Sequence, residues 1–426
     1  MFSLKFHGAS TKIRSICCIL AALFVCAGVR PALAYGRDDV RAAYQDTVAA
    51  RASGSPYAAQ PDLVSFSTPG EITAGAANDA LNYLNFLRWI AGLEGVQLNR
   101  VYTIRSQCGA TLLAANDALD HHPAKAAGMS DAYYESALLG TSLGNIAKFN
   151  WMRPDILLDG VAYFARDDGD YNLSTLGHRR WLLNPNMSAT GFGLANAASG
   201  MTYVAMYAVD EGNAAAQWNH VAWPASGAFP ADLMRTDLAW SVSLNPEIYS
   251  LDQSAPSIIL RELRSGKIFR FDPVSGSGDG YCRISRENYG AGPCIIFRPD
   301  LAAAGISAYE QNQRWQVEIS GLRTVSGSAA SIEYTCEMIS LYPQDVSNVE
   351  ITPLQASLNV GQQLQLETAV VPAYADDLTV FYVSDNEAVA TVTDSGLVTA
   401  VSEGSCRITV MSVNNRRDSC EVIVKP

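Results

Sequence analysis

The stretch of sequence that decides the fold is GHRRWLLNPN at residues 177–186, followed by TGFG at residues 190–193. The first part has the apolar spacing of a helix that begins near Ser174 and ends before Asn184-Pro185. The second part opens a segment in which glycines bound alternating apolar residues, as is typical of short strands. A helix followed at once by short strands predicts a domain that mixes helices with a small sheet.

The surrounding sequence extends this pattern in both directions. Three upstream segments have helical periodicity, at residues 81–93, 104–119 and 154–164, and the last of them begins at Pro154, which is allowed in a first helical turn. Downstream, Tyr203, Ala205 and Tyr207 alternate as a strand. Residues 76–220 therefore predict one α/β domain.

The segment at residues 177–193 resembles the signature of bacterial CAP-superfamily domains, the group of cysteine-rich secretory, antigen 5 and pathogenesis-related proteins. Three further pieces match: LDHHP at residues 119–123, GNIA at residues 144–147 and YVAMY at residues 203–207. The resemblance covers roughly residues 76–220. It implies an α-β-α sandwich.

The CAP resemblance also implies a cleft with two histidines and two acids. It places His121, or its neighbour His122, and His178 at the histidine positions, and the second acid at or near Asp167, with Asp168 as the alternative. Together His121, His178 and Asp167 would hold a divalent metal such as zinc. The first acid is missing, because Gly144 stands where the family has glutamate. The cleft candidates are His121, His122, Asn145, Asp167, Asp168 and His178.

Two arginines follow His178 directly in the sequence. We interpret Arg179 and Arg180 as residues on a solvent-exposed face, or as ion-pair partners of Asp167, Asp168 or Asp170. Neither reading gives them a part in the cleft.

The second half of the chain is predicted to be all β. Residues 225–345 contain short alternating segments separated by turns, which predict a β-rich accessory domain folded as a sandwich. Residues 348–426 alternate more cleanly and predict a small sandwich. This segment resembles bacterial Ig-like domains of group 2, through Val360-Gly361, Val371-Pro372, VATV at residues 389–392, SGLV at residues 395–398 and Gly404.

The N-terminus has the pattern of a secretory signal. Residues 1–34 carry cations ahead of an apolar run and end in Ala32-Leu33-Ala34, a cleavage pattern. Residues 35–75 are then an N-terminal extension or linker. The formal net charge of −12 would become −16 without the four cations of the leader, which excludes nucleic acid as a partner. We expect a secreted protein that can associate with the cell wall and that has no transmembrane helix in the mature chain.

Six cysteines remain after the leader. Cys282 and Cys294 flank a glycine-rich turn region and are the pair expected to form a disulfide in an exported protein. Cys108 and Cys336 lie on apolar stripes and are expected to be buried thiols. No zinc spacing of cysteines is present.

Three functions follow from these features. The first is a binding protein whose cleft takes a small apolar ligand, a peptide or a divalent metal, with β modules presenting it to a cell-envelope polymer or a host surface. The second is a metal-assisted hydrolase that uses His121 and His178. The third is a structural adhesin with an inert CAP scaffold. No Gly-x-Ser-x-Gly or His-Glu-x-x-His motif supports an enzyme, so catalytic residues are not assigned.

Overall fold

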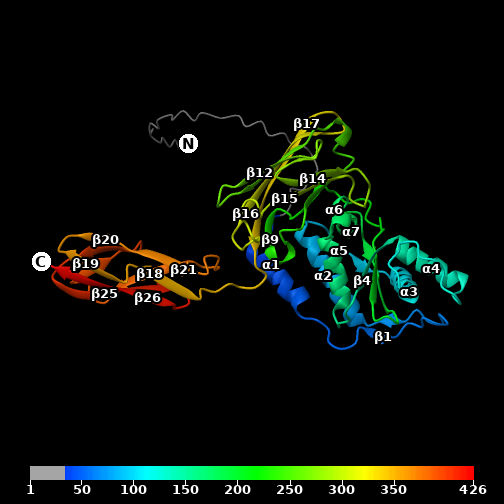
Figure 1. Ribbon diagram of the computed structural model, residues 1–426, viewed down its shortest axis with the longest axis horizontal. Helices are drawn as coiled ribbons and strands as arrows, with labels where there is room; N and C mark the ends of the chain where they lie inside the picture. Colours follow the sequence, from blue (N-terminus) through cyan, green and yellow to red (C-terminus); the bar gives the residue numbers. More distant parts are fainter. Residues whose placement is uncertain (1–33) are drawn as a thin grey trace, which may run out of the picture.

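The computed structural model describes residues 34–426. The predicted signal segment at residues 1–34 lies outside the described residues, apart from Ala34. Within the described range, no helix is both long enough and apolar enough to cross a bilayer. The chain forms a main body of helices and β-sheets and a separate β unit near the C-terminus (Figure 1).

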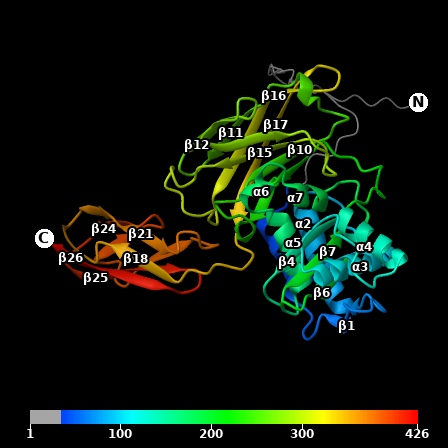
Figure 2. The same ribbon diagram turned by 45° about the vertical axis from the view of Figure 1, so that its right-hand side comes forward.

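The first unit is a three-stranded antiparallel sheet between helices. The sheet has the order β4 (Gly144–Phe149), β7 (Thr202–Tyr207), β6 (Phe192–Asn196). Helix α3 (Arg100–Asn116) packs on one face and is backed by α4 (Asp131–Ser142), whereas α5 (Ile156–Arg166) packs on the other and is backed by α2 (Ala74–Ile90). Figure 2 shows these layers from the side. The smaller elements are α6 (Asp170–Leu173), α7 (Gly177–Leu182), β3 (Gln97–Leu98) and β5 (Ala189–Thr190).

The alternation of the strands explains the three layers. Tyr203 and Ala205 of β7 pack into a cluster with α3, whereas Val204 and Met206 pack into the larger core with α2 and α5. Successive side chains of a strand point to opposite faces, so a strand that is apolar at every position must be covered on both sides. The predicted mixture of helices and a small sheet is what the structure contains.

The next unit is a β-sandwich, as the sequence predicts for residues 225–345. One sheet has the order β14-β15-β10-β8 and the other β13-β12-β11-β16-β17-β9. Their bounds are β8 (His220–Trp223), β9 (Gly227–Pro230), β10 (Trp240–Leu244), β11 (Ser257–Glu262), β12 (Ile268–Asp272), β13 (Ser277–Gly278), β14 (Gly280–Ser285), β15 (Cys294–Pro299), β16 (Arg314–Arg323) and β17 (Ala329–Ile339). Short 3₁₀ turns lie at Ala231–Leu233 and Leu251–Gln253.

The α/β unit and this sandwich share one hydrophobic core. A single cluster runs from Leu87 of α2 and Phe164 of α5 to Trp240 of β10 and Trp315 of β16. Burial of apolar area is the main favourable term in folding, and here residues of both units contribute to the same buried cluster. They therefore form one packed body.

The C-terminal unit has its own core. Its strands form the sheets β18-β21, β19-β26-β25-β22 and β20-β24-β23. The bounds are β18 (Asn348–Thr352), β19 (Gln355–Asn359), β20 (Gln363–Gln365), β21 (Glu367–Val371), β22 (Val380–Ser384), β23 (Ala390–Val392), β24 (Leu397–Ala400), β25 (Gly404–Ser412) and β26 (Arg417–Lys425). A core of its own is the mark of a unit that can fold alone.

An N-terminal helix joins the two bodies. The segment contains α1 (Arg37–Tyr44), a π turn (Gln45–Ala49), β1 (Tyr57–Ala59) and β2 (Glu71–Ile72). Asp376 of the C-terminal unit accepts from Arg41 Nη1 at 2.8 Å, Arg37 Nη1 at 3.1 Å and the Gln344 amide at 2.9 Å. Burial alone would raise the pKa of Asp376, but the hydrogen bonds from Arg41 and Gln344 hold it below its ordinary value. One carboxylate thus ties the N-terminal helix to the C-terminal unit.

The predicted disulfide between Cys282 and Cys294 is wrong, because both thiols are free. The antiparallel register of β14 and β15 pairs Cys282 with Phe297, and Cys294 with Ser285. Position 282 lies three residues from 285 along β14, so the two cysteines occupy opposite faces of the sheet. Cys282 packs in the shared core, and Cys294 packs in a small cluster beside Leu176.

All six cysteines of the described residues are free and buried, as expected for Cys108 and Cys336. Burial raises the pKa of every one of these thiols. A thiol with a raised pKa is a weak nucleophile and a weak metal ligand at neutral pH. These six side chains therefore act as small apolar residues.

Candidate functional site

His178 is held by groups from two neighbouring elements. Its Nδ1 lies 2.9 Å from Asp167 Oδ1, and the other oxygen of Asp167 accepts from the Arg179 amide at 3.2 Å. Asn145 of β4 donates from Nδ2 to the His178 carbonyl at 2.9 Å. Asp167 caps the end of α5 in the left-handed conformation, which turns its side chain back toward α7. The side chain and the backbone of His178 are both fixed.

The contact with Asp167 decides which nitrogen of His178 is free. A carboxylate only accepts, so Nδ1 carries a proton, and in the neutral ring Nε2 then has the lone pair. The imidazole is 19% exposed, whereas the Asp167 side chain is 0% exposed. Asp167 was predicted as a metal ligand, and this role is corrected: the carboxylate is buried behind His178 and positions it.

His121 is fixed in the same way by a different partner. Its Nδ1 lies 2.8 Å from the Thr141 carbonyl of α4, and the Thr141 hydroxyl donates to the His121 carbonyl at 3.0 Å. A carbonyl oxygen cannot donate, so the His121 proton is on Nδ1 and its Nε2 is free. The residue as a whole is exposed to solvent. Both histidines therefore use Nδ1 as an anchor.

The charge of one imidazole affects the other. Loss of hydration lowers the pKa of His121, and the neighbouring His178 and His122 lower it further, whereas the hydrogen bond to Thr141 opposes this shift. His121 is thus neutral at neutral pH. His178 in α7 and His121 in the loop after α3 thus each use Nδ1 for a protein contact, which leaves Nε2 for another partner.

The remaining cleft candidates separate into two groups. Asn145 is 1% exposed and belongs to the support of His178. Among the described residues, only the backbone of His122 is hydrogen-bonded, whereas the His121 ring has a partner, and Asp168 accepts from Arg235 Nη2 at 3.0 Å; neither His122 nor Asp168 is therefore held as the pair is. Across residues 34–426, no three His, Cys, Asp or Glu side chains gather closely enough to hold a metal ion. Catalytic zinc takes three protein ligands, and this pair supplies two.

Gly144 occupies a place where no side chain fits. A Cβ atom built at this position would lie 2.4 Å from the Gly140 carbonyl oxygen and 3.0 Å from the Met206 carbonyl oxygen. Both contacts are to backbone atoms, which cannot turn away as a flexible side chain can. The absence of a glutamate at this position is therefore built into the packing of α4 against the sheet.

Arg179 and Arg180 are buried, which corrects their predicted exposure. Their residues are 1% and 2% exposed, and the ion pairs of the described residues include neither of them. Both guanidinium groups donate to backbone carbonyls instead. Sequence periodicity did not indicate this, because arginine is almost never fully buried without a charged partner.

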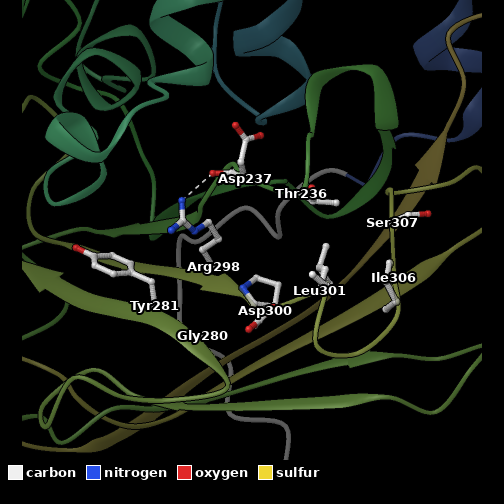
Figure 3. A pocket seen from close by; sticks show the side chains of 11 residues that line it. Thr236, Asp237, Gly280, Tyr281, Arg298, Asp300, Leu301, Ile306 and Ser307 are labelled. Atoms are coloured by element: carbon white, nitrogen blue, oxygen red, sulfur yellow. Dashed lines mark hydrogen bonds between the residues drawn. The ribbon is translucent and has the colours of Figure 1, made fainter.

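One pocket of the structure has no histidine in its lining. It has a volume of about 540 Å³ and lies in the β-sandwich, between Asp237, Tyr281 and Leu301 (Figure 3). Two of its polar residues are already engaged, because Arg235 pairs with Asp237, and Arg298 donates to the Asp237 carbonyl at 3.1 Å. The cavity therefore adds no group to the histidine pair.

Comparisons with known proteins match a small part of the chain. A kappa-carrageenase of Pseudoalteromonas carrageenovora is 38% identical over 69 residues, which are 16% of this chain and 17% of the enzyme. A 3-O-alpha-D-galactosyl-alpha-L-arabinofuranosidase of Bifidobacterium longum subsp. longum is 43% identical over 72 residues, which are 16% of this chain and 6% of that enzyme. The chain thus spans less than a fifth of either relative.

Solved structures give similarly partial matches. An intimin mutant of EHEC O157:H7 is 21% identical, covers 18% of this chain and 46% of that chain, and has a TM-score of 0.16. Domains 4 and 5 of the S-layer protein SbsC are 20% identical, cover 28% of this chain and 69% of that chain, and have a TM-score of 0.18. Likenesses this low carry no argument about the whole chain.

The family comparison agrees with the fold of the C-terminal unit. Residues 345–422 match the family described as bacterial Ig-like domain (group 2). The matched range covers the strands from β18 to most of β26 and the separate core that they enclose. The C-terminal unit of this chain is therefore a bacterial Ig-like domain of group 2.

Proposed function

We propose that this chain is a surface-presented bacterial binding protein. In this proposal a CAP-like α/β unit offers the His121–His178 pair to a ligand, and the Ig-like domain presents that unit at the cell surface. The CAP assignment rests on the signature at residues 177–193 and on the three-layer arrangement of helices about the sheet. The presentation rests on the Ig-like match and the separate core of that domain.

The observation that carries the proposal is that both imidazoles are anchored through the same ring nitrogen. Each ring is anchored through Nδ1, by Asp167 or by the Thr141 carbonyl, so that each offers Nε2. In this proposal both Nε2 atoms reach one ligand, and two such acceptors suit a divalent cation, or the N–H groups of a peptide. They suit a purely apolar ligand less well, because it would leave both lone pairs without a partner.

The Ig-like domain would orient this site as well as carry it. Asp376 binds Arg37 and Arg41 of α1, and α1 packs against β9 and α2 of the main body. A linker without such contacts would let the two bodies rotate freely. The proposed partners of the presented surface are a cell-envelope polymer or a host surface.

The proposal is tested by titrating Zn²⁺ into the chain from residue 35 to residue 426 and measuring the heat of binding. Zn²⁺ is the probe because two neutral imidazoles coordinate it and water can complete its shell. We expect binding at one site, lost in the double variant His121→Ala, His178→Ala. The matched control is His122→Ala, which removes an adjacent exposed imidazole and should leave binding unchanged. Equal heats for the double variant and the parent chain would reject the histidine pair as a binding site.

A further inference from the structure

Arg179 connects the histidine site to the β-sandwich. Its Nη1 donates to the Ala239 carbonyl, directly before β10, at 2.7 Å. Its Nε and Nη2 donate to the carbonyls of Ala165 and Arg166 at the end of α5, each at 2.7 Å. One guanidinium thus binds the helix that carries Asp167 and a strand of the other unit.

Arg180 makes a second connection to the same sandwich. Its Nη1 donates to Ser285 Oγ at 2.8 Å, and its Nη2 donates to the Glu287 and Gly292 carbonyls in the loop between β14 and β15. Its guanidinium carbon lies 5.0 Å from the centre of the Tyr289 ring. The loop that the sequence predicts as a turn is therefore wrapped around this side chain.

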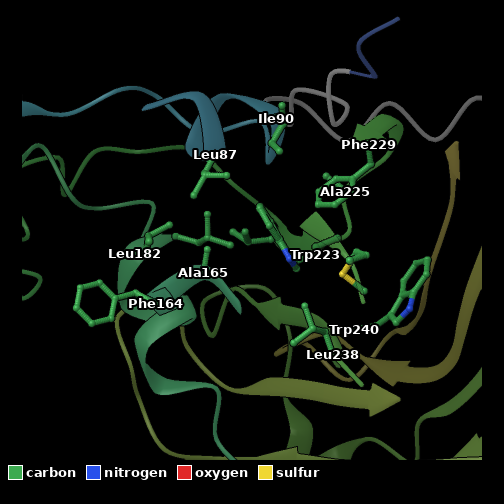
Figure 4. Packing of buried hydrophobic residues seen from close by; sticks show 14 of the residues in the cluster. Leu87, Ile90, Phe164, Ala165, Leu182, Trp223, Ala225, Phe229, Leu238 and Trp240 are labelled. Carbon is green, nitrogen blue, oxygen red and sulfur yellow. The ribbon is translucent and has the colours of Figure 1, made fainter. Parts of the chain in front are cut away.

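Arg179 lies beside the apolar core that the two units share. Trp223 lies in the middle of the shared core, with Leu87, Phe164 and Leu182 of the α/β unit around it (Figure 4). The Arg179 guanidinium lies 6.0 Å from the Trp223 ring. Burial lowers the pKa of Arg179 to about 10, so this side chain is still a cation at neutral pH.

Buried cations without a carboxylate partner are a costly way to join two units. An apolar residue of similar size at either position would often stabilise the fold as well or better. Hydrogen bonds, unlike apolar contacts, fix direction as well as distance. The two arginines directly follow His178 in α7, a helix of six residues that has no side-chain N-cap. So short a helix is not stable by itself, and its contacts set its position.

We propose that the β-sandwich positions His178 through Arg179 and Arg180, so that the ligand site is assembled from both units. This inference rests on the proposed function of the His121–His178 pair. Arg179 and Arg180 are positioning residues: they hold α7, and α7 sets the direction of His178 Nε2. Asp167 binds both the His178 ring and the Arg179 amide, so a shift of α7 reaches the imidazole directly.

The test measures how fast diethyl pyrocarbonate modifies His178, site by site, by mass spectrometry. This reagent attacks an unprotonated imidazole nitrogen, and the exposed His122 serves as the internal reference. The variant Ser285→Ala removes an acceptor of Arg180 from the sandwich side, and Arg180→Lys removes the forked donor. We expect His178 to react roughly tenfold faster in both, the factor for one lost hydrogen bond to a charged group. The melting temperature of Ser285→Ala should fall by only a few degrees, because Arg180 and Glu287 each lose one hydrogen bond and the protein stays folded.

The matched control is Ser243→Ala, a buried serine of the same sandwich whose hydroxyl does not contact either arginine. In the Ser243→Ala protein, the reagent should modify His178 at the same rate as in the parent chain. If folded Ser285→Ala and Ser243→Ala proteins both react at the parent rate, the sandwich does not position His178. The readout is independent of ligand binding: if the parent chain binds no Zn²⁺ but the variants differ in rate, the proposed function fails and the positioning stands.

Discussion

The variant Gly144→Glu should lose stability and should not gain a metal ligand. The added Cβ would lie 2.4 Å from the Gly140 carbonyl oxygen and 3.0 Å from that of Met206, so α4 or the sheet must move. Overpacking of this kind costs about 1–3 kcal/mol, and a buried carboxylate without a partner adds to it. We expect the free energy of unfolding to fall by about 3 kcal/mol or more, measured by urea denaturation.

The control for this variant lies on the same strand. Lys148 of β4 is exposed, so Lys148→Glu places the same side chain where it has room and should change stability by less than about 0.5 kcal/mol. A Gly144→Glu protein that is as stable as the parent, and binds Zn²⁺ more tightly, would show that the cleft accepts the missing acid. That outcome would overturn the packing argument at Gly144.

Acidification from pH 7 to pH 5 should destabilise the main body through His220. Burial lowers the pKa of this imidazole to about 4, whereas an unfolded histidine titrates near 6.5. Its Nδ1 has no hydrogen-bond partner among the described residues, and its ring stacks on Tyr334 with centroids 6.4 Å apart. The environment of His220 therefore favours the neutral ring.

The sign of the pH effect follows from linkage. The folded pKa is below the unfolded one, so the unfolded chain binds the proton first as the pH falls. The stability that His220 contributes is fully present above pH 6.5 and decreases progressively as the pH falls to about 4. Between pH 7 and pH 5 the loss is about 2 kcal/mol. Urea denaturation at the two pH values measures it. His220→Phe should reduce the difference in the free energy of unfolding between pH 7 and pH 5, whereas His122→Phe should leave that difference unchanged. An equal difference in the parent chain and both variants would contradict the assignment to His220.

Local patterns predicted the elements well. The spacing of apolar residues around residues 177–193 predicts a helix and then strands, and α7 and β6 lie there. The alternation after residue 348 predicts the strands of the Ig-like domain, which the family match supports. Periodicity is a property of residues close together in the sequence. These elements could be predicted because such local patterns are sufficient to distinguish a helix from a strand.

The site depended on contacts that no local pattern records. His121 and His178 were candidates from a resemblance, but the role of Asp167 as a buried support depends on how α5 ends. The burial of Arg179 depends on the Ala239 carbonyl, sixty positions away in the sequence. The false disulfide has the same cause, because the register of β14 with β15 sets the face on which each cysteine lies.

The most direct test of the account is the tautomer of the two site histidines. Long-range ¹H–¹⁵N correlation spectra of residues 35–426 at neutral pH report whether each ring carries its proton on Nδ1 or Nε2. Single variants, His121→Ala and His178→Ala, assign the signals. We predict the Nδ1–H form for both rings, because Asp167 and the Thr141 carbonyl hold those protons. An Nε2–H form for either ring would remove one of the two lone pairs and contradict the proposed binding site.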